Sequence, residues 1–404
     1  MSREKGGTMT EPPRLDRVED FSLVLGGPLF QLFRRSRLAG DTLELLHRRI
    51  LISMLLTWLP LLILSAIGGS VLGGGIKVPF LYDIETHVRF LLALPILIAA
   101  ELVVHLRGRP TVKAFLDRGV VPPEELPRFE AAISSFMRVR NSAPLEVGLL
   151  VVVYTLFLWI WRNQLALDAT TWFARPGGGL LNLTPAGYWY AFVSIPVFQF
   201  ILLRWYLRIF LWFTFLWRVS RLDLHLIPTH PDRAGGLGFL GQSTYAFAPI
   251  LLAQGTLLSG MIAGRIFYEG ANVMDFKVQV AGFLAFFVAF VLGPLAVFTP
   301  HLSRARRRGL AEYGTLASRY VQGFEEKWVR GGASGDEEFL GTGDIQSLAD
   351  LGNSYAVVQE MRLVPFGVRD AARIAAVTAA PLLPLVLTIY SPDELVTELI
   401  KVLF

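Results

Sequence analysis

The chain has 404 residues, of which 53% are hydrophobic and 18% are charged, and its mean hydropathy is +0.49. Soluble proteins usually carry about 25% charged residues, so this composition argues against a cytosolic globular protein. The sequence has no cysteine, which excludes disulfides, thiol catalysis and cysteine-ligated metal centres. The net charge is +5. The basic residues lie mostly between the apolar runs, as membrane topology explains, so no nucleic-acid partner is expected.

The N-terminal segment, residues 1–49, is expected to be cytoplasmic. Residues 1–20 are polar and charged, and the short apolar stretch Phe21–Phe33 is followed by Arg34, Arg35 and Arg37. Such a stretch with a basic tail is typical of an interfacial helix whose arginines contact anionic headgroups. The sequence therefore predicts anionic membrane lipids as partners on the cytoplasmic side.

Apolar runs along the rest of the chain predict an all-α, polytopic membrane protein with about seven transmembrane helices. A helix needs about 20 predominantly apolar residues to cross a bilayer. Seven runs approach or exceed this length: Ile50–Ile76, Phe90–Leu106, Ala143–Trp161, Tyr188–Trp217, Leu237–Gly264, Val278–Ser303 and Ile374–Ser391.

Basic residues between these runs predict the orientation. Most of the 38 Lys and Arg residues fall in residues 1–49, 107–142, 218–242 and 304–373, and cytoplasmic loops retain such residues. The helices are then paired as 50–106, 143–217 and 243–303, with the last helix at 374–391. We expect a protein of the inner (plasma) membrane with a cytoplasmic N-terminus and an outward-facing C-terminal tail at 392–404.

The longer cytoplasmic segments are predicted to be helical extensions of the membrane part. Residues Pro123–Arg140 form an expected amphipathic helix, and the start of segment 304–373 is expected to continue the sixth span into the cytosol. Apolar residues then recur at helical spacing from Ile345 to Met361, which predicts a second amphipathic helix.

Five ionisable residues inside or beside the spans form a candidate intramembrane polar path: Glu101, His105, Glu146, Arg204 and Arg208. Charged groups at membrane depth are costly and usually functional. Arg204 and Arg208 lie four residues apart, on one helix face, and Glu101 has a similar expected depth, so we predict a Glu101–Arg204 pair. The alternatives are arginines that snorkel to the headgroups and purely structural ion pairs.

The glycine-rich loop before the fifth span is a candidate anion or lipid-headgroup site made by Arg233, Gly235 and Gly236. Free N–H groups and a helix dipole favour an anion at a helix N-terminus. The alternative is that Asp232 caps the turn itself. Nucleotide binding is not expected, because no strand precedes these glycines and Gln242 stands where a P-loop needs lysine.

Catalytic signatures are absent from the sequence, and no cofactor or metal is expected. None of the six histidines lies in an H-E-x-x-H motif or beside a G-x-S-x-G motif. We therefore expect a channel or transporter for an ion or small solute, with a signalling or assembly platform as the alternative and a membrane enzyme as a lesser one.

The seventh span carries the candidate gate. Leu382, Leu385 and Thr388 lie beside Pro381 and Pro384, where a hydrophobic constriction would gate a pore by dewetting. The order of elements, with seven spans, long cytoplasmic helices and a short last span, resembles the insect chemoreceptor type of ion channel. That resemblance in topology implies a homo-oligomer in which the C-terminal span lines a central pore.

Overall fold

The computed structural model describes residues 21–26, 45–73, 76, 78–164, 171–175, 183–333 and 341–386. Most described residues are helical, as expected for an all-α protein, and the rest form turns, short non-helical segments and two isolated bridges, Val78–Thr171 and Ala174–Leu183. Five helices are long and apolar enough to cross a membrane: Leu46–Ile67, Ile84–Asp117, Pro185–Val219, Phe239–Glu269 and Val273–Val329. They indicate a multi-pass membrane protein.

The first of these helices is shorter than the apolar run predicts. It consists of α3 (Leu46–Thr57) and α4 (Leu59–Ile67), which meet at Trp58. The expected span ended at Ile76, but the helix stops before Gly68, and Gly69 takes a left-handed φ of 68°. Glycine adopts this conformation without steric cost, so it ends the helix although the chain remains apolar.

Two of the long helices widen into a π-helical turn just before a proline. Residues Val88–Ala93 join α5 (Ile84–His87) to α6 (Leu94–Asp117), and residues Tyr190–Ser194 join α9 (Pro185–Trp189) to α10 (Ile195–Val219). Pro95 and Pro196 lack an N–H group, and their rings crowd the carbonyl four residues earlier. The wider turn relieves this clash, and the Phe192 carbonyl accepts a hydrogen bond from the Tyr154 hydroxyl at 3.2 Å. Both helices therefore continue through their prolines.

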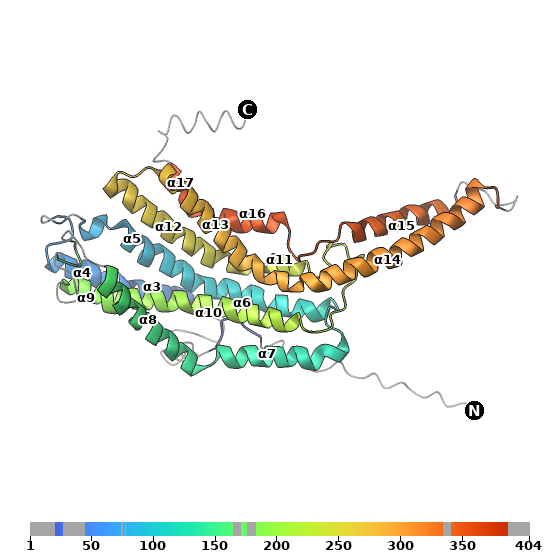
Figure 1. Ribbon diagram of the computed structural model, residues 1–404. Helices are drawn as coiled ribbons and strands as arrows, with labels where there is room; N and C mark the ends of the chain where they lie inside the picture. Colours follow the sequence, from blue (N-terminus) through green and yellow to red (C-terminus); the bar gives the residue numbers. More distant parts are fainter. Residues whose placement is uncertain are drawn as a thin grey trace, which may run out of the picture.

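The remaining helices complete a bundle of nearly parallel elements (Figure 1). Helix α8 (Ala143–Gln164) packs on α10, and α7 (Leu126–Arg140), preceded by a 3-10 turn at Pro123–Glu125, lies beside the other end of α10. The later elements are α11 (Phe239–Ser243), a 3-10 turn (Thr244–Phe247), α12 (Ala248–Glu269), a 3-10 turn (Val273–Phe276) and α13 (Lys277–Leu292).

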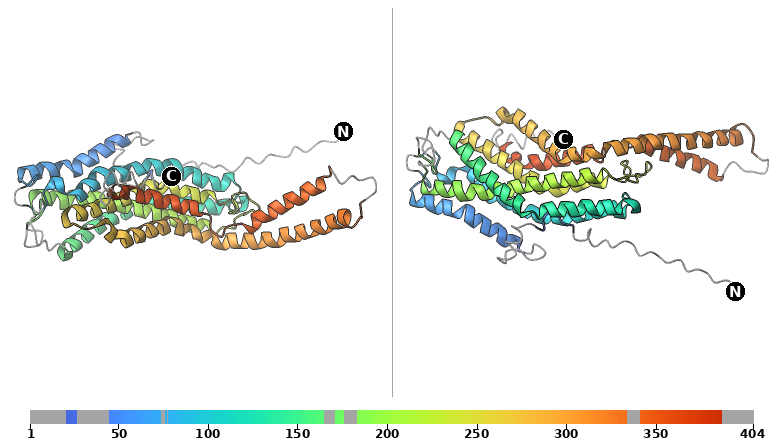
Figure 2. Two further views of the ribbon diagram at one scale, coloured as in Figure 1. Left: turned by 90° about the horizontal axis from the view of Figure 1, so that it is seen from above. Right: turned by 60° about the horizontal axis from the view of Figure 1, so that its bottom comes forward.

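A helical hairpin projects from one end of the bundle (Figure 2). The chain passes from α13 through a 3-10 segment (Gly293–Phe298) into α14 (Thr299–Phe324) and a π-turn (Glu325–Val329), and α15 (Gly343–Gln359) packs back along α14. Asp344 fastens the tip by accepting hydrogen bonds from Lys327 Nζ and Trp328 Nε1, each at 2.9 Å. Both helices expected in segment 304–373 are therefore present.

The C-terminal helix begins earlier than the seventh apolar run predicts. Helix α16 (Val368–Ala379) starts before Ile374, and the Asp370 side chain accepts the Gly367 N–H at 2.8 Å. A 3-10 turn (Ala380–Leu382) and α17 (Leu383–Val386) follow. A Cβ atom at Gly255 of α12 would lie 2.0 Å from the Thr378 carbonyl oxygen, so α16 packs against α12 at backbone distance. Residues 387–391 of this run lie outside the described residues.

The expected interfacial helix is not formed by its first six residues. Residues 21–26, named here the N-terminal strap, are non-helical, and Phe21, Leu23 and Val24 are only 1–2% exposed. The ring of Phe21 lies 5.2 Å from that of Phe136 on α7 and 5.8 Å from that of Phe215 on α10. Burial between two helices removes more apolar surface from water than lying at an interface does, which explains the difference. Residues 27–33 lie outside the described residues.

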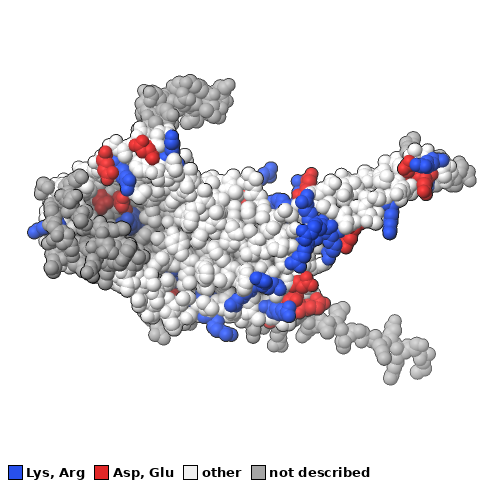
Figure 3. Space-filling model, in the orientation of Figure 1, with Lys and Arg blue, Asp and Glu red and all other residues white. Residues whose placement is uncertain are grey.

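Charged side chains gather at the two ends of the helical bundle and at the tip of the hairpin, and few lie on the middle of the bundle in this view (Figure 3). Large apolar side chains face outward along the helices, among them Leu55 at 45%, Ile63 at 49% and Phe286 at 59% exposure. Exposed apolar surface of this extent is unusual for a soluble monomer. It forms the belt expected of helices that face lipid.

Single cysteines in this cysteine-free chain will report which end faces the cytosol. Leu72 is 68% exposed after α4, and Val329 is 70% exposed near the tip of the hairpin. We expect an impermeant thiol reagent to label Leu72→Cys in intact cells and to label Val329→Cys only after permeabilisation, because the basic segments stay inside. The opposite pattern would show that the orientation is inverted.

Candidate functional site

Glu101 of α6 is the centre of a buried group of charges. Its Oε1 atom lies 2.9 Å from Arg208 Nη1 and 3.3 Å from Arg204 Nη1, both on α10. Its Oε2 atom accepts a hydrogen bond from Arg49 Nη2 at the start of α3. The expected Glu101–Arg204 pair is thus present, whereas sequence reasoning missed Arg49, which reads as one more basic residue before the first span.

Glu146 of α8 joins the same group through Arg204, whose Nε lies 3.2 Å from Glu146 Oε1. We call the five residues the Arg–Glu cluster: Arg49, Glu101, Glu146, Arg204 and Arg208. Each is only 4–7% exposed. The arginines therefore do not snorkel to a surface, and the cluster ties together α3, α6, α8 and α10.

The N-terminal strap closes the cluster with backbone carbonyls. Arg208 Nη2 donates to the Val24 oxygen at 3.1 Å, and Arg204 Nη2 donates to the Gly26 oxygen at 3.4 Å. Gly26 has a φ of 141°, and a Cβ atom there would lie 2.2 Å from Asn141 Oδ1. Only glycine therefore allows the strap backbone to approach the arginines this closely.

Arg140 of α7 adds a further positive charge on the far side of the strap. Its Nη1 donates to the Ser22 carbonyl, and the side chain is 9% exposed. Burial, together with repulsion from Arg204, lowers the pKa of Arg140 to about 10. Among the described residues, four arginines thus lie around two glutamates.

A small cavity lies inside the cluster, with a volume of about 20 Å³. Arg49, Glu101, Arg204 and Arg208 line it together with Trp205, whose ring lies 4.9 Å from the Arg208 guanidinium carbon. About 10–15 Å³ is enough for one water molecule. The cavity is therefore large enough for one water molecule.

The position of Arg204 along α10 gives the depth of the cluster. Arg204 lies sixteen residues after Tyr188, or about 24 Å along the helix axis at about 1.5 Å per residue. The long helix Pro185–Val219 has 35 residues, so the cluster lies well inside it rather than at either end.

His105, the fifth residue of the expected polar path, faces the strap and makes no described contact with the cluster. Its Nδ1 atom lies 3.1 Å from the Ser22 hydroxyl, which itself accepts the N–H groups of Val24 and Leu25 at 3.1 and 2.9 Å. His105 therefore helps to hold the strap in place.

The loop expected to bind an anion is occupied by its own aspartate. The Asp232 carboxylate accepts the N–H groups of Ala234 at 2.8 Å, Gly236 at 3.1 Å and Gly238 at 2.7 Å. Burial alone would raise the pKa of Asp232, but these bonds and His230 hold it below its usual value.

Arg233 takes no part in holding an anion at this loop. Its backbone has a φ of 53°. Its side chain pairs with Glu360 at 2.8 Å, and both side chains are more than half exposed. The anion site expected at Arg233, Gly235 and Gly236 is therefore corrected to a capped turn, because Asp232 already neutralises the Gly236 N–H.

Two of the three expected gate residues, Leu382 and Leu385, pack within the chain. Leu385 is 6% exposed and packs with Leu258, Ile262 and Phe276, and Leu382 is partly buried against the same group. These contacts lie within one chain and fasten the C-terminal helix to α12, so neither leucine lines an opening there. Thr388 lies outside the described residues.

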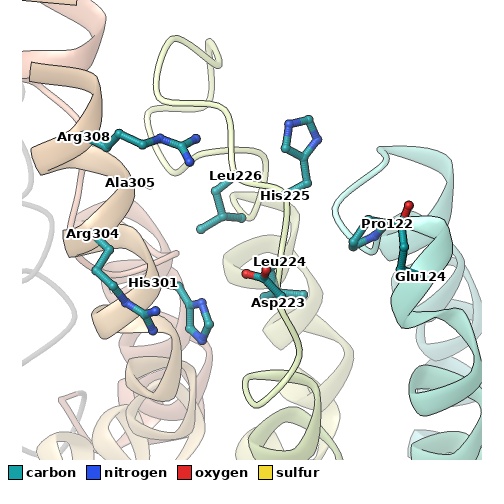
Figure 4. A pocket seen from close by; sticks show the side chains of 10 residues that line it. All are labelled: Pro122, Glu124, Asp223, Leu224, His225, Leu226, His301, Arg304, Ala305 and Arg308. Carbon is teal, nitrogen blue, oxygen red and sulfur yellow. The ribbon is translucent and has the colours of Figure 1, made fainter. Parts of the chain in front are cut away.

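A groove on the surface between α14 and the segment after α10 was not expected (Figure 4). Two cavities of about 600 and 520 Å³ share Asp223, His301 and Arg304. Leu222, Leu224 and Leu226 are buried and alternate with exposed polar residues, which holds this segment extended. His301 Nε2 bonds the Ser220 carbonyl at 2.7 Å. Among the described residues no group of three potential ligands is arranged to hold a metal ion.

Comparisons with models of known protein families, with curated proteins and with solved structures found no match for this chain. The topological resemblance to insect chemoreceptor channels therefore gains no support from them.

Replacing Glu101 will test how strongly the cluster stabilises the fold. We expect Glu101→Gln and Arg204→Gln each to lower the unfolding free energy by roughly 3–5 kcal/mol, because each strands a buried charge. The double variant should lose less than the sum, with a coupling of roughly 0.5–3 kcal/mol. The measurement is denaturant unfolding of the purified protein in detergent.

Glu325→Gln is the matched control for this cycle. Glu325 lies 2.9 Å from Arg330, with side chains 47% and 71% exposed, and such exposed pairs contribute about 0–1 kcal/mol. Strictly additive losses for Glu101 and Arg204 would contradict a coupled cluster.

Asp232→Ala will test the capped turn. We expect faster hydrogen exchange at the amides of Ala234, Gly236 and Gly238, since three N–H groups lose their acceptor. Because the folded-state pKa is lowered, the cap stabilises the wild type above the ordinary value of 3.8 and is lost as pH falls through the folded-state pKa. Asp223→Ala, in an exposed position nearby, should change none of these exchange rates. Unchanged exchange in Asp232→Ala would contradict the role of Asp232 as the cap.

Proposed function

We propose that this chain crosses the inner membrane seven times, with its N-terminus inside, and conducts or transports a small anion. The two passes beyond the five long helices would be α8, whose part Ala143–Thr155 is apolar, and the C-terminal segment that starts with α16. The hairpin of α14 and α15 then lies in the cytosol, where the basic residues of segment 304–373 favour it.

The Arg–Glu cluster is the observation that carries this proposal. Ionisable groups from four helices meet inside the bundle, where a bilayer makes every unpaired charge costly. Four arginine side chains converge on one buried point, and guanidinium groups attract an anion and repel a cation. The 20 Å³ cavity among them has room for a particle of the size of a water molecule.

The N-terminal strap supports a closed state of this path. Its carbonyl oxygens at Ser22, Val24 and Gly26 accept hydrogen bonds from three arginines, so they take the places that an anion would occupy. Phe21 anchors the strap between α7 and α10. Release of the strap would free the arginines toward the cytoplasmic side.

Anion flux from liposomes tests this function. We expect Phe21→Ala with Leu23→Ala to raise chloride efflux at least about tenfold, because a buried Phe→Ala change costs about 3–5 kcal/mol and each 1.4 kcal/mol shifts an equilibrium about tenfold. Arg208→Gln should lower efflux in the same background. A chloride electrode follows the release, and a potassium electrode measures selectivity.

Phe286→Ala is the matched control, since Phe286 is 59% exposed on α13 and its ring contacts Phe287 and Phe290 of the same helix. It should leave the flux unchanged. Equal potassium and chloride rates, or no flux above protein-free liposomes in both the wild type and the strap variant, would exclude anion transport.

A signalling or assembly platform is the second candidate function, favoured by the hairpin. The hairpin extends away from the bundle (Figure 1) and exposes Leu316, Val321 and Ile345 at 51%, 48% and 42%. Capture of a defined cytosolic protein by photocrosslinkers at these positions, in a chain that passes no anion, would favour it over transport.

We also propose anionic lipid headgroups and further copies of this chain as partners. The groove of Figure 4 replaces the glycine loop as the lipid site, because Arg304 and Arg308 of α14 face it. Trp217, 50% exposed at its edge, is typical of a residue at the membrane interface.

A further inference from the structure

A second cavity lies on another face of α10, in the outer half of the bundle. It has a volume of about 570 Å³ and lies between α10, α12, α13 and the start of the second long helix. Ile195 and Leu202 on α10, Leu257 on α12 and Phe283 on α13 line it while being only partly buried. The cavity therefore opens on the apolar belt, where molecules dissolved in the membrane reach it.

Two glutamine amides in this cavity have buried atoms without a hydrogen-bond partner. They are the Gln199 Oε1 atom on α10 and the Gln254 Nε2 atom on α12. Gln254 is 6% exposed. Unpaired polar atoms in an apolar place are costly, and natural proteins rarely keep them without a reason. One is an acceptor and the other is a donor, so together they match a group that both donates and accepts.

The two amides lie near the middle of the membrane. Gln199 follows Tyr190 by nine residues, or about 14 Å along the helix. Gln254 precedes Arg265 by eleven residues, or about 16 Å along its helix. Both distances are about half of a 30 Å hydrocarbon core. Tyr190 marks the outer end because its hydroxyl accepts a hydrogen bond from Arg89 Nη1 at 2.7 Å.

The chemistry of the lining residues defines the ligand. Glu85 and Arg89, at the start of the second long helix, line the cavity and lie 3.6 Å apart, so this pair brings no excess charge. The rest of the lining is apolar, as at Phe198, Leu257 and Phe283, apart from the two glutamines. A molecule that fills this space has an uncharged polar end and an apolar tail.

We propose that this cavity is a binding site for a membrane-soluble amphiphile that carries an uncharged amide at one end of an apolar chain. Gln254 Nε2 donates a hydrogen bond to the ligand carbonyl, and the ligand N–H donates to Gln199 Oε1. The chain runs outward along Phe198 and Phe283. The site is separate from the Arg–Glu cluster, whose cavity faces Ile201 and Trp205 of α10, so it does not depend on anion transport.

Tritiated decanamide is the probe, and its binding is measured on the full chain in nanodiscs, with empty nanodiscs subtracted. N,N-dimethyldecanamide is the matched ligand, because it keeps the chain and the carbonyl but has no N–H group. We expect saturable binding of decanamide and about tenfold weaker binding of the dimethyl compound. Gln199→Met and Gln254→Met should each weaken decanamide binding about tenfold and reduce the preference between the two probes.

Gln279→Met is the control variant, since Gln279 is an exposed glutamine of α13 outside the cavity, and it should bind like the wild type. Equal affinity of the wild type for the two probes, which needs no variant to fold, would overturn the proposal. So would the absence of saturable binding, or an equal loss in Gln279→Met.

Discussion

The energetic cost of a charge in a low-polarity interior is the constraint on which this structure depends. Glu101 cannot remain ionised among apolar helices without cations, and Arg49, Arg204 and Arg208 cannot remain there without an acceptor. Four helices and the N-terminal strap therefore meet at one point. The cluster thus fixes how α3, α6, α8 and α10 are placed around one another, in a setting where apolar packing against lipid alone is weakly directional.

The strap shows how backbone groups take part in this balance. Its carbonyls carry partial negative charge, and they accept hydrogen bonds from Arg140, Arg204 and Arg208. Because the strap is held by packing of Phe21 and by a few hydrogen bonds rather than by a long helix, its removal is less costly than the separation of two helices. A short segment of this kind is suited to cover a charged site reversibly.

Helix α10 separates two polar sites of different character. One face carries the arginines of the cluster toward α6 and α8, and another face carries Gln199 toward α12. The first site is charged, nearly closed and close to the strap, while the second is larger, lined mostly by apolar side chains and open to the apolar belt. The π-turn before Pro196 shifts the register of side chains along this helix and so sets which residues face each site.

The sequence by itself determined the helical class, the places of the long helices and the Glu101–Arg204 pair, because apolar length and depth along a helix are local properties of the chain. It did not determine Arg49, the strap carbonyls or the cavity between Gln199 and Gln254, since these depend on which faces of distant segments meet. The sequence allowed either a bound anion or the Asp232 carboxylate at the glycine-rich loop. Only the folded loop showed that the carboxylate accepts the hydrogen bonds of the N–H groups. Leu385 reads as a gate in an apolar run, yet its neighbours on α12 make it part of the core, because burial is decided by tertiary packing.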